Sequence, residues 1–444
     1  MDSRMQDVSV ETKIEAYVSQ YSGHSRLTRL LKIAENSHDL FVAVGAIKIA
    51  NKIAKKEGLL GFYYETVRML KKIFATEPGA CPLPDFGSDL SFDRSQNEQY
   101  KMQVKKKDTE IQQLQKAIIR DSIRLSYFDL GGIHYRFGFL SEAVKAWSRS
   151  LDYATQEEDL FNVTYHLAQA AFENQSPIYL TKYAGEAEAR ERTLGKPTNK
   201  TMQVKVLDAL SSLQQDNLKD AAIRMANNIQ VTDEKALTEF VRAKDLAFYI
   251  VICSLHSLSR KEIKTHILSA PGYKALMETT NEGCSINVSD VIENFLNGRY
   301  VEYQNQINEI AKQMRYDLYF GHKLGRVMKN IRKKALIQYV TPYKVIDMRE
   351  IQKAFGIPLE QIENEIAELI ISKQIQAKID SHSKLLYSRK DNETLNSYKD
   401  AVELGSKFIQ ETEAALLRVQ VMQKKLILKA PPRGGDGPHK LDLM

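Results

Sequence analysis

Cysteine is scarce in this sequence of 444 residues, and its scarcity excludes two classes of protein. The three cysteines, Cys81, Cys253 and Cys284, are odd in number and lie far apart. They form neither a disulfide framework nor a zinc knuckle, so we expect a reducing compartment. The longest apolar stretch, residues 246–253, is far too short to cross a bilayer, and residues 1–13 hold no apolar leader. We therefore expect a chain without a membrane partner, in the cytoplasm and nucleus.

Signatures of enzymes are also missing. No two histidines stand two, three or four residues apart, which excludes the HxH and HExxH patterns of metal-dependent hydrolases. The pair Gly195-Lys196 is followed by Pro197 and lacks the upstream glycine of a phosphate-binding loop. Neither GxSxG nor kinase signatures occur. We expect no catalytic residue, no cofactor and no metal, and we interpret His382 as a polar turn residue.

The composition favours a globular, mostly helical protein of two or three folding units. Hydrophobic residues make up 43% of the chain and charged residues 27%, and there are only 11 prolines. The net charge of +7 is a small difference between 63 bases and 56 acids that are interleaved along the chain. Such a distribution is unlike a nucleic-acid-binding arm, and it indicates no particular partner.

Residues 26–320 consist of amphipathic blocks with apolar residues three and four apart, which predicts a stack of helices. One block has close to the offsets of a tetratricopeptide helix pair, with Gly131, Ala143 and Trp147 at the key positions. We expect Gly131 to let the paired helix approach, Ala143 to fit the crossing, and Trp147 to fill the groove as a core residue. The sequence therefore predicts a repeat-like helical solenoid, which offers surfaces rather than a catalytic pocket.

The pattern changes near residue 323. A helix to about Tyr339 is followed by a short strand at 344–348, a small helix at 349–355 and a second helix at 358–370. Residues 375–380 then alternate apolar and polar side chains, as a half-buried strand does, and 384–389 form the second strand of a hairpin. Helix, strand, helix, helix and hairpin is the order of a winged helix.

The helix at 358–370 takes the place of the DNA-reading helix of such a domain, yet it has no lysine or arginine. It carries four glutamates, which we expect to face outward: Glu360, Glu363, Glu365 and Glu368. Its buried stripe is expected to be Ile362, Ile366, Leu369 and Ile370. Because carboxylates would repel phosphates, we interpret the domain as a protein-interaction module whose hairpin edge accepts a neighbour's strand.

Three candidate interaction surfaces follow from these patterns. The candidate winged-helix edge comprises Ile375, Ala377, Ile379, Leu386 and Tyr387. The candidate basic face comprises Arg326, Lys329 and Lys333, which could meet phosphate or an acidic protein. A final helix over 395–429 has an apolar stripe that repeats every seven residues, and its candidate bundle interface comprises Val402, Phe408, Ile409, Leu416, Val419 and Leu426. So long a helix needs packing to stay ordered, so we expect it to pack on other chains.

Several stretches resemble a known family. Residues 21–35, 129–153, 331–348 and 375–389, together with the C-terminal helix that ends in LKAPPR, resemble the PCI-domain scaffold subunits. Members of that family are subunits of the proteasome lid, the COP-nine signalosome and translation initiation factor three. The sequence of these stretches is most similar to the subunit-one family of the signalosome. The N-terminus and residues 190–235 carry no stretch that matches.

The resemblance implies an all-α-dominated fold and a non-catalytic architectural subunit. The family's complex removes the ubiquitin-like modifier from cullins and so regulates cullin-RING ubiquitin ligases, with its isopeptidase metal site on a different subunit. Family members associate through winged helices side by side and through C-terminal helices in a common bundle. The alternatives are a related PCI subunit of the proteasome lid and, less favoured, a winged-helix nucleic-acid binder that uses the candidate basic face.

These patterns divide the chain as follows: 1–20, flexible N-terminus; 21–75, N-terminal helical segment; 76–98, linker; 99–322, helical repeat array; 323–390, winged helix of the PCI domain; 395–429, C-terminal bundle helix; 430–444, disordered tail.

Overall fold

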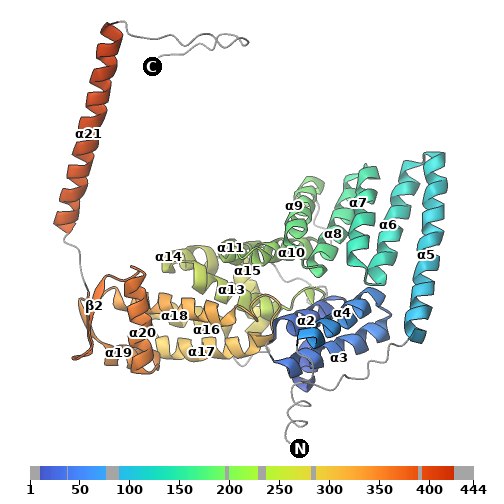
Figure 1. The fold of residues 1–444 in the computed structure, drawn as a ribbon, viewed down its shortest axis with the longest axis horizontal. Coiled ribbons are helices and arrows are strands. Elements are labelled where there is room, and N and C mark those ends of the chain that lie inside the picture. Colours follow the sequence, from blue (N-terminus) through green and yellow to red (C-terminus); the bar gives the residue numbers. More distant parts are fainter. Residues whose placement is uncertain are drawn as a thin grey trace, which may run out of the picture. The chain divides into compact units, whose positions relative to one another are not determined.

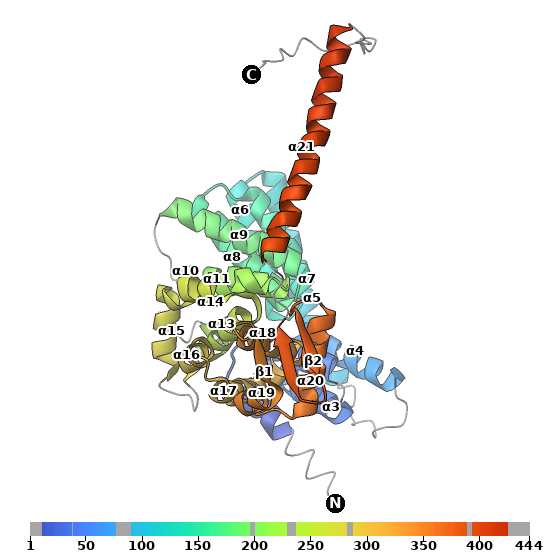
Figure 2. The same cartoon turned by 90° about the vertical axis from the view of Figure 1, so that its left-hand side faces the viewer.

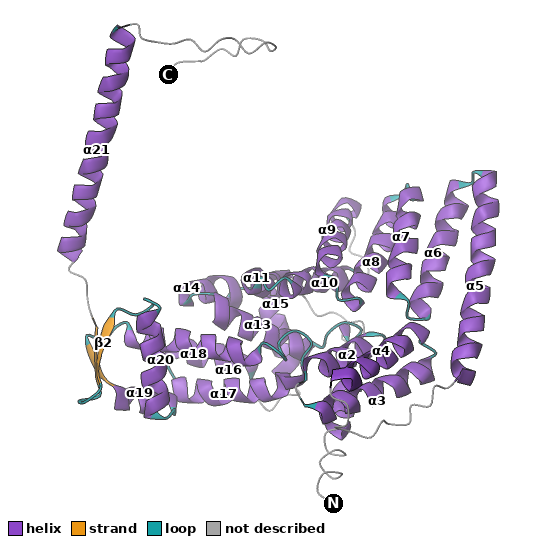
Figure 3. Cartoon of the chain, in the orientation of Figure 1, coloured by secondary structure: helices purple, strands orange, loops and turns teal. Residues whose placement is uncertain are grey.

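The computed structural model of the protein describes residues 11–37, 39–76, 90–195, 200–228, 237–281, 287–388 and 393–424. These residues are helical almost throughout, and their strands lie in one short region near the C-terminal end of the compact part of the chain (Figure 3). A helical solenoid followed by a winged helix is thereby confirmed as the fold class.

The first compact unit comprises the chain up to Tyr339 together with Ile351–Ile362. Its first helices are α2 (Ser25–Asn36), α3 (Leu40–Glu57), α4 (Leu60–Thr76), α5 (Leu90–Ala117), α6 (Arg120–Arg136), α7 (Leu140–Tyr153), α8 (Glu157–Glu173), α9 (Pro177–Leu194), α10 (Thr201–Gln214) and α11 (Leu218–Asn228). They are followed by α13 (Ala243–Ser257), α14 (Arg260–Glu262), the π-helix η1 (Ile263–Leu268), α15 (Pro271–Asn281), α16 (Val288–Asn297), α17 (Tyr300–Gln313), the 3-10 helix η2 (Met314–Tyr316) and α18 (Leu324–Val340).

Successive helices from α5 to α9 lie side by side as a row of antiparallel hairpins (Figure 1). The tightest contact in this row is between α6 and α7. A methyl group added to Gly131 on α6 would meet the Trp147 ring of α7 at 2.4 Å. Trp147 is buried, and its indole N–H donates to the carbonyl of Phe128 at 3.1 Å. The roles predicted for Gly131 and Trp147 are therefore confirmed, since only a residue without a side chain lets the ring approach this closely.

This packing predicts opposite effects for two adjacent glycines. Gly131→Ala is expected to lower the free energy of unfolding by about 1–3 kcal/mol, because the added methyl displaces a buried ring. Gly132→Ala adds its methyl where nothing lies within 4 Å, so it should gain about 0.5–1 kcal/mol from helix propensity. Urea unfolding of both variants, followed by circular dichroism, tests the pair. Equal effects of the two substitutions would contradict the proposed packing.

The N-terminal boundaries differ from the predicted ones. Residues 11–18, predicted to be part of a flexible N-terminus, are helical. Ile14 and Val18, one helical turn apart, are both buried in the core of the N-terminal segment, which explains the order. The linker predicted over 76–98 is also shorter on its C-terminal side, because α5 begins at Leu90. Residues 1–10 and 77–89 lie outside the described part of the chain.

A buried cluster of charged and phenolic groups joins α2 to later parts of the first unit. Arg29 is fully buried, and its guanidinium donates to the Tyr17 hydroxyl and to the Phe240 carbonyl, both at 3.1 Å. It lies 3.7 Å from the Asp317 carboxylate and 4.0 Å from the centre of the Tyr21 ring. Burial raises the pKa of Asp317, and the Arg29 charge opposes that rise. Arg29 is therefore the counterion that allows a carboxylate to remain inside the array.

The C-terminal boundary of the array also differs from the prediction. The α18 helix, predicted to open the winged helix at residue 323, belongs to the first unit by its contacts. Lys334 on α18 donates to the carbonyls of His256 and Leu258 at the end of α13, where helical carbonyls lack partners. Burial there lowers the pKa of Lys334 to about 8. By contacts, the boundary lies near residue 340.

The second unit comprises Val340–Glu350 and the chain from Glu363 onward. Its strands are β1 (Val345–Asp347), β2 (Ala377–Asp380) and β3 (Leu385–Ser388), in the order β1-β3-β2 with antiparallel pairing throughout (Figure 2). The helices α19 (Met348–Phe355) and α20 (Leu359–Ile371) contribute residues to both units, and α21 (Glu393–Gln423) follows the sheet. The predicted order of strands and helices is confirmed, and the bounds from β1 to β3 agree within about two residues; the predicted end of the last helix, 429, lies outside the described residues.

Candidate interaction surfaces

The sheet has two outer strands, β1 and β2, and the predicted edge residues divide between them and the centre. Ala377 and Ile379 lie on the outer strand β2, whereas Leu386 and Tyr387 lie on β3, which is paired on both sides. Ile375 precedes β2. The side chains of Ile375, Ala377 and Leu386 are buried, Ile379 is half-buried, and Tyr387 is exposed. Among the predicted residues, only those on β2 lie on an outer strand, so the edge that they offer is the backbone of β2. Three of the five side chains form core beneath it. Their interface role stays a prediction.

The sheet also has an exposed face that the sequence analysis missed. The register aligns Val345, Tyr387 and Lys378 in one row across all three strands, and all three side chains are exposed. Tyr343, two residues before Val345, is exposed as well. Tyr387 was singled out from the sequence, but its exposed neighbours follow only from the register, which a single sequence does not reveal.

The hairpin turn between β2 and β3 is held by one carboxylate. Asp380 accepts hydrogen bonds from the Ser383 hydroxyl at 2.5 Å and from the backbone N–H of His382 at 3.0 Å. These bonds lower the pKa of Asp380. His382 is exposed and takes part through its backbone, in agreement with its interpretation as a turn residue.

The glutamates of α20 do not all face outward, which corrects one prediction. Glu360 and Glu368 are exposed, but Glu363 is half-buried and pairs with Lys384 at 2.6 Å. Glu365 is buried, because it directly precedes Ile366 and shares the inward side of the helix. Ile362, Ile366 and Leu369 are buried as predicted, and Ile370 is half-buried. The exposed side of α20 is therefore less acidic than the sequence indicates, although it still carries no cation.

The candidate basic face lies on α18. Arg326 and Lys329 are exposed, and Lys333 is half-buried. Lys329 and Lys333 already take part in interactions within the chain. Two of its three cations therefore already have partners within the chain, and the proposed use of the face for phosphate or an acidic partner stays a prediction.

The apolar stripe of α21 is exposed over its whole described length. Val402, Ile409 and Leu416, the residues spaced by seven, are each more than half exposed. The other exposed apolar side chains on this helix are Tyr398, Leu404, Phe408, Leu417, Val419 and Met422. Leu426, the last residue of the predicted stripe, lies outside the described residues, as does the predicted tail 430–444. An apolar surface of this extent in water is typical of a binding site for another chain.

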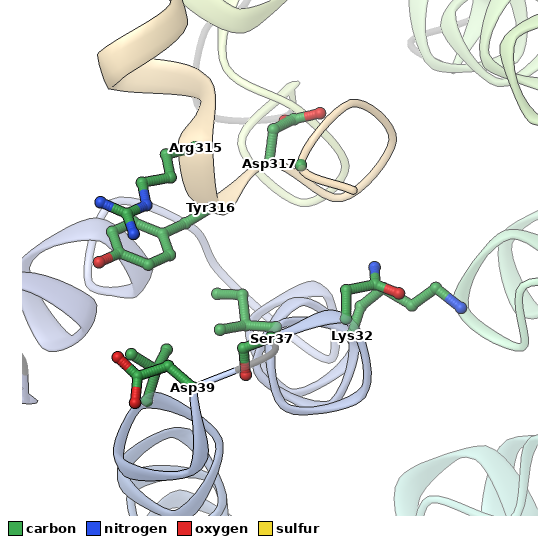
Figure 4. A pocket seen from close by; sticks show the side chains of 10 residues that line it. Lys32, Ser37, Asp39, Arg315, Tyr316 and Asp317 are labelled. Atoms are coloured by element: carbon green, nitrogen blue, oxygen red, sulfur yellow. The ribbon is translucent and has the colours of Figure 1, made fainter. Parts of the chain in front are cut away.

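A pocket of about 220 Å³ lies between the end of α2 and the turn after η2 (Figure 4). Lys32, Ser37 and Asp39 lie on one side of it, and Arg315, Tyr316 and Asp317 on the other. Its lining offers a serine but no histidine to activate it.

Within the described ranges, no group of three or more histidine, cysteine, aspartate or glutamate side chains could hold a metal ion. In the same ranges, no helix is long and apolar enough to cross a membrane.

Comparison with known proteins identifies the C-terminal module. Residues 306–390 match the PCI domain. This part of the chain is therefore similar in sequence to the PCI-domain family. Residues 91–266 of the solenoid match a second family, described as 26S proteasome subunit RPN7. A helical array that runs into a PCI-like module is thus indicated both by sequence and by fold, which is the arrangement of scaffold-type PCI subunits.

Two sets of PCI relatives differ in how much of the chain they cover. COP9 signalosome complex subunit 1 of Arabidopsis thaliana is 26% identical over 92% of this chain and 90% of its own length. Subunit 1b of Drosophila melanogaster is 25% identical over 97% of this chain and 89% of its own. The 26S proteasome regulatory subunit RPN7 of Saccharomyces cerevisiae is 20% identical over 63% of this chain and 64% of its own. Similarity to the signalosome subunits therefore covers nearly the whole chain, whereas similarity to the proteasome subunit covers 63% of it.

Proposed function

We propose that this PCI protein is a non-catalytic scaffold subunit of a signalosome, the complex that removes the ubiquitin-like modifier from cullins and so regulates cullin-RING ubiquitin ligases. The observation that carries the proposal is the extent of similarity, 92–97% of the chain for the signalosome subunits of Arabidopsis and Drosophila. The related lid subunit of the proteasome is the second candidate, because RPN7 matches 63% of the chain.

The exposed surfaces support this role. The outer strand β2 offers an unpaired backbone edge that a neighbouring winged helix could extend. The apolar stripe of α21 offers a surface for a bundle of helices from other PCI subunits. In this proposal the cullin-RING ligase is the substrate of the whole complex, and the chain acts in the cytoplasm and the nucleus.

Affinity purification of the tagged chain tests the proposal. Full-length protein and a variant that ends at Asn392, which lacks α21, are purified from separate cytosolic and nuclear extracts at moderate salt with nuclease present. We expect signalosome subunits and cullins to copurify with the full-length chain from both extracts, and to be lost or strongly reduced with the variant. Size-exclusion chromatography of the variant alone shows whether its solenoid remains folded.

Two results would contradict the proposal. Recovery of proteasome lid subunits in place of signalosome subunits would select the second candidate. Recovery of nucleic acid when nuclease is omitted, with no stable protein partner, would favour a winged-helix nucleic-acid binder. The logarithm of its binding constant should then fall by about 0.9 per phosphate neutralised for each tenfold increase in salt concentration.

A further inference from the structure

The corner between α5 and α6 has an unusual residue at its tightest point. After α5 ends at Ala117, the backbone N–H of Ile118 donates to the Gln115 carbonyl at 3.3 Å, and Ile118 has a φ of 57°. A left-handed residue directly after a helix is usually glycine, because glycine has no Cβ to clash. In this chain Gly58, Gly195 and Gly298 fill the same position after α3, α9 and α16.

Isoleucine is poorly suited to this conformation, because a β-branched side chain clashes with the backbone when φ is positive. The other non-glycine residues that the structure records with positive φ are Gln175, Asp216, Lys373 and Lys384, none of which is β-branched. Ile118 also gains nothing from burial, since 79% of its surface is exposed. The corner therefore keeps a residue that destabilises the isolated chain.

The surroundings of Ile118 combine apolar and cationic groups. Ile119 and, six residues further on, Leu125 are each about half exposed, and Met102, which is 72% exposed, lies about 24 Å back along α5. From Glu98 to the corner, the exposed cations are Lys101, Lys105, Lys106, Lys116 and Arg120. Across the described residues, no ion pair is recorded for any of these five. The exposed acids of the same stretch are Glu98, Asp108 and Asp121, so the surface has a positive balance.

We propose that the α5–α6 corner, defined by Ile118 and Ile119 together with the exposed cations of α5, is a docking site for an acidic segment of another protein. An apolar anchor of that segment would cover the two isoleucines, and its carboxylates would meet the lysines of α5. The exposed side chains of Ile118, Ile119 and Leu125 favour a peptide over a phosphate backbone, which has no apolar group to bury. Within the first unit, the upper ends of α5 and α6 are joined by a short loop that other described helices of that unit do not cover (Figure 3). This site is independent of the β2 edge and of α21.

The strain at Ile118 is tested by thermal unfolding of the full-length chain. Ile118→Gly and Ile118→Asn should each raise the midpoint of the first transition by about 1–3 °C, because both residues tolerate a positive φ. Ile178→Asn is the matched control, since Ile178 is 78% exposed but has no positive φ. Its midpoint should stay unchanged or fall. If the Ile118 variants were no more stable than the wild type, the argument from strain would be overturned.

Binding is tested by fluorescence anisotropy with three labelled probes. These are a 20-residue peptide of glutamates with leucines at helical spacing, the same peptide with lysine in place of glutamate, and a 20-nucleotide single-stranded RNA. The full-length chain should bind the acidic peptide best. Ile118→Asn/Ile119→Asn and Lys105→Glu/Lys106→Glu should each weaken this binding at least fivefold, whereas Ile178→Asn should leave it unchanged.

Added salt separates the two kinds of contact. It should weaken the wild type more than the Lys105→Glu/Lys106→Glu variant, because that variant has lost its charge contacts. Tighter binding of the RNA than of the acidic peptide would overturn the proposal. Equal binding of the acidic peptide by wild type and both corner variants would overturn it as well.

Discussion

Replacing Arg29 with methionine is expected to lower the free energy of unfolding by about 3–5 kcal/mol. The substitution keeps an unbranched apolar side chain of about the length of the arginine stem but leaves the buried Asp317 carboxylate without its cation, and an uncompensated charge in the interior is costly. It also removes donors from the Tyr17 hydroxyl and the Phe240 carbonyl. Urea unfolding of the purified chain, followed by circular dichroism and by tyrosine fluorescence, measures the change.

Arg26→Ala is the matched control, because Arg26 lies on the same helix and its side chain is one-third exposed, 3.8 Å from Glu57. Its effect should stay within about 1 kcal/mol, as for other exposed ion pairs. The double variant Arg29→Met/Asp317→Asn should lose less stability than the sum of the two single variants, because each removes the group that the other leaves unpaired. Strict additivity would show that the two charges do not stabilise each other.

Three aspartates on the stripe of α21 are expected to abolish assembly without unfolding the monomer. Ile409, Leu416 and Val419 are more than half exposed in the isolated chain, so Ile409→Asp/Leu416→Asp/Val419→Asp changes no core contact of the monomer. In a helical bundle the same positions would bury three unpaired charges, each at a cost of several kcal/mol. Copurification from native extract measures assembly, and thermal unfolding of the purified variant measures the fold.

The control places the same charges on the opposite side of the helix. Lys407→Asp/Gln410→Asp/Ala414→Asp places three aspartates at exposed positions about 100° or more around the helix from Ile409, Leu416 and Val419, and it should assemble normally. Loss of assembly in both triple variants would indicate a general effect of charge. Unfolding of the stripe variant would indicate that α21 packs within its own chain.

Much of the fold follows from local patterns in the sequence. Alternation at Ile375, Ala377 and Ile379 predicts β2 because one face of a half-buried strand must be apolar, and the structure confirms it. The spacing of Gly131 and Trp147 likewise predicts a close helix pair, because both effects act between neighbouring elements. Boundaries are less predictable, since the helix at 11–18 is ordered by packing of Ile14 and Val18 rather than by its own propensity.

Features that depend on contacts between distant residues could not be predicted. Arg29 and Asp317 are separated by most of the chain, and nothing near either residue in the sequence indicates that both are buried. Glu365 was expected outside because the apolar residues of α20 were taken to form its buried stripe, but its spacing of three from Ile362 and four from Leu369 places it on the same face. The exposed row of Val345, Tyr387 and Lys378 requires the register of three strands. The interface roles of these surfaces remain predictions.

The exposed stripe of α21 has a consequence for the amount of this protein that a cell can hold. A copy made in excess of its partners would display a long row of apolar side chains, the kind of surface that chaperones and degradation machinery bind. Once covered by neighbouring subunits, the same surface would no longer be accessible to them. We therefore expect the abundance of the chain to follow that of its partners, so that the stoichiometry of the complex is set by the lifetime of its unassembled parts.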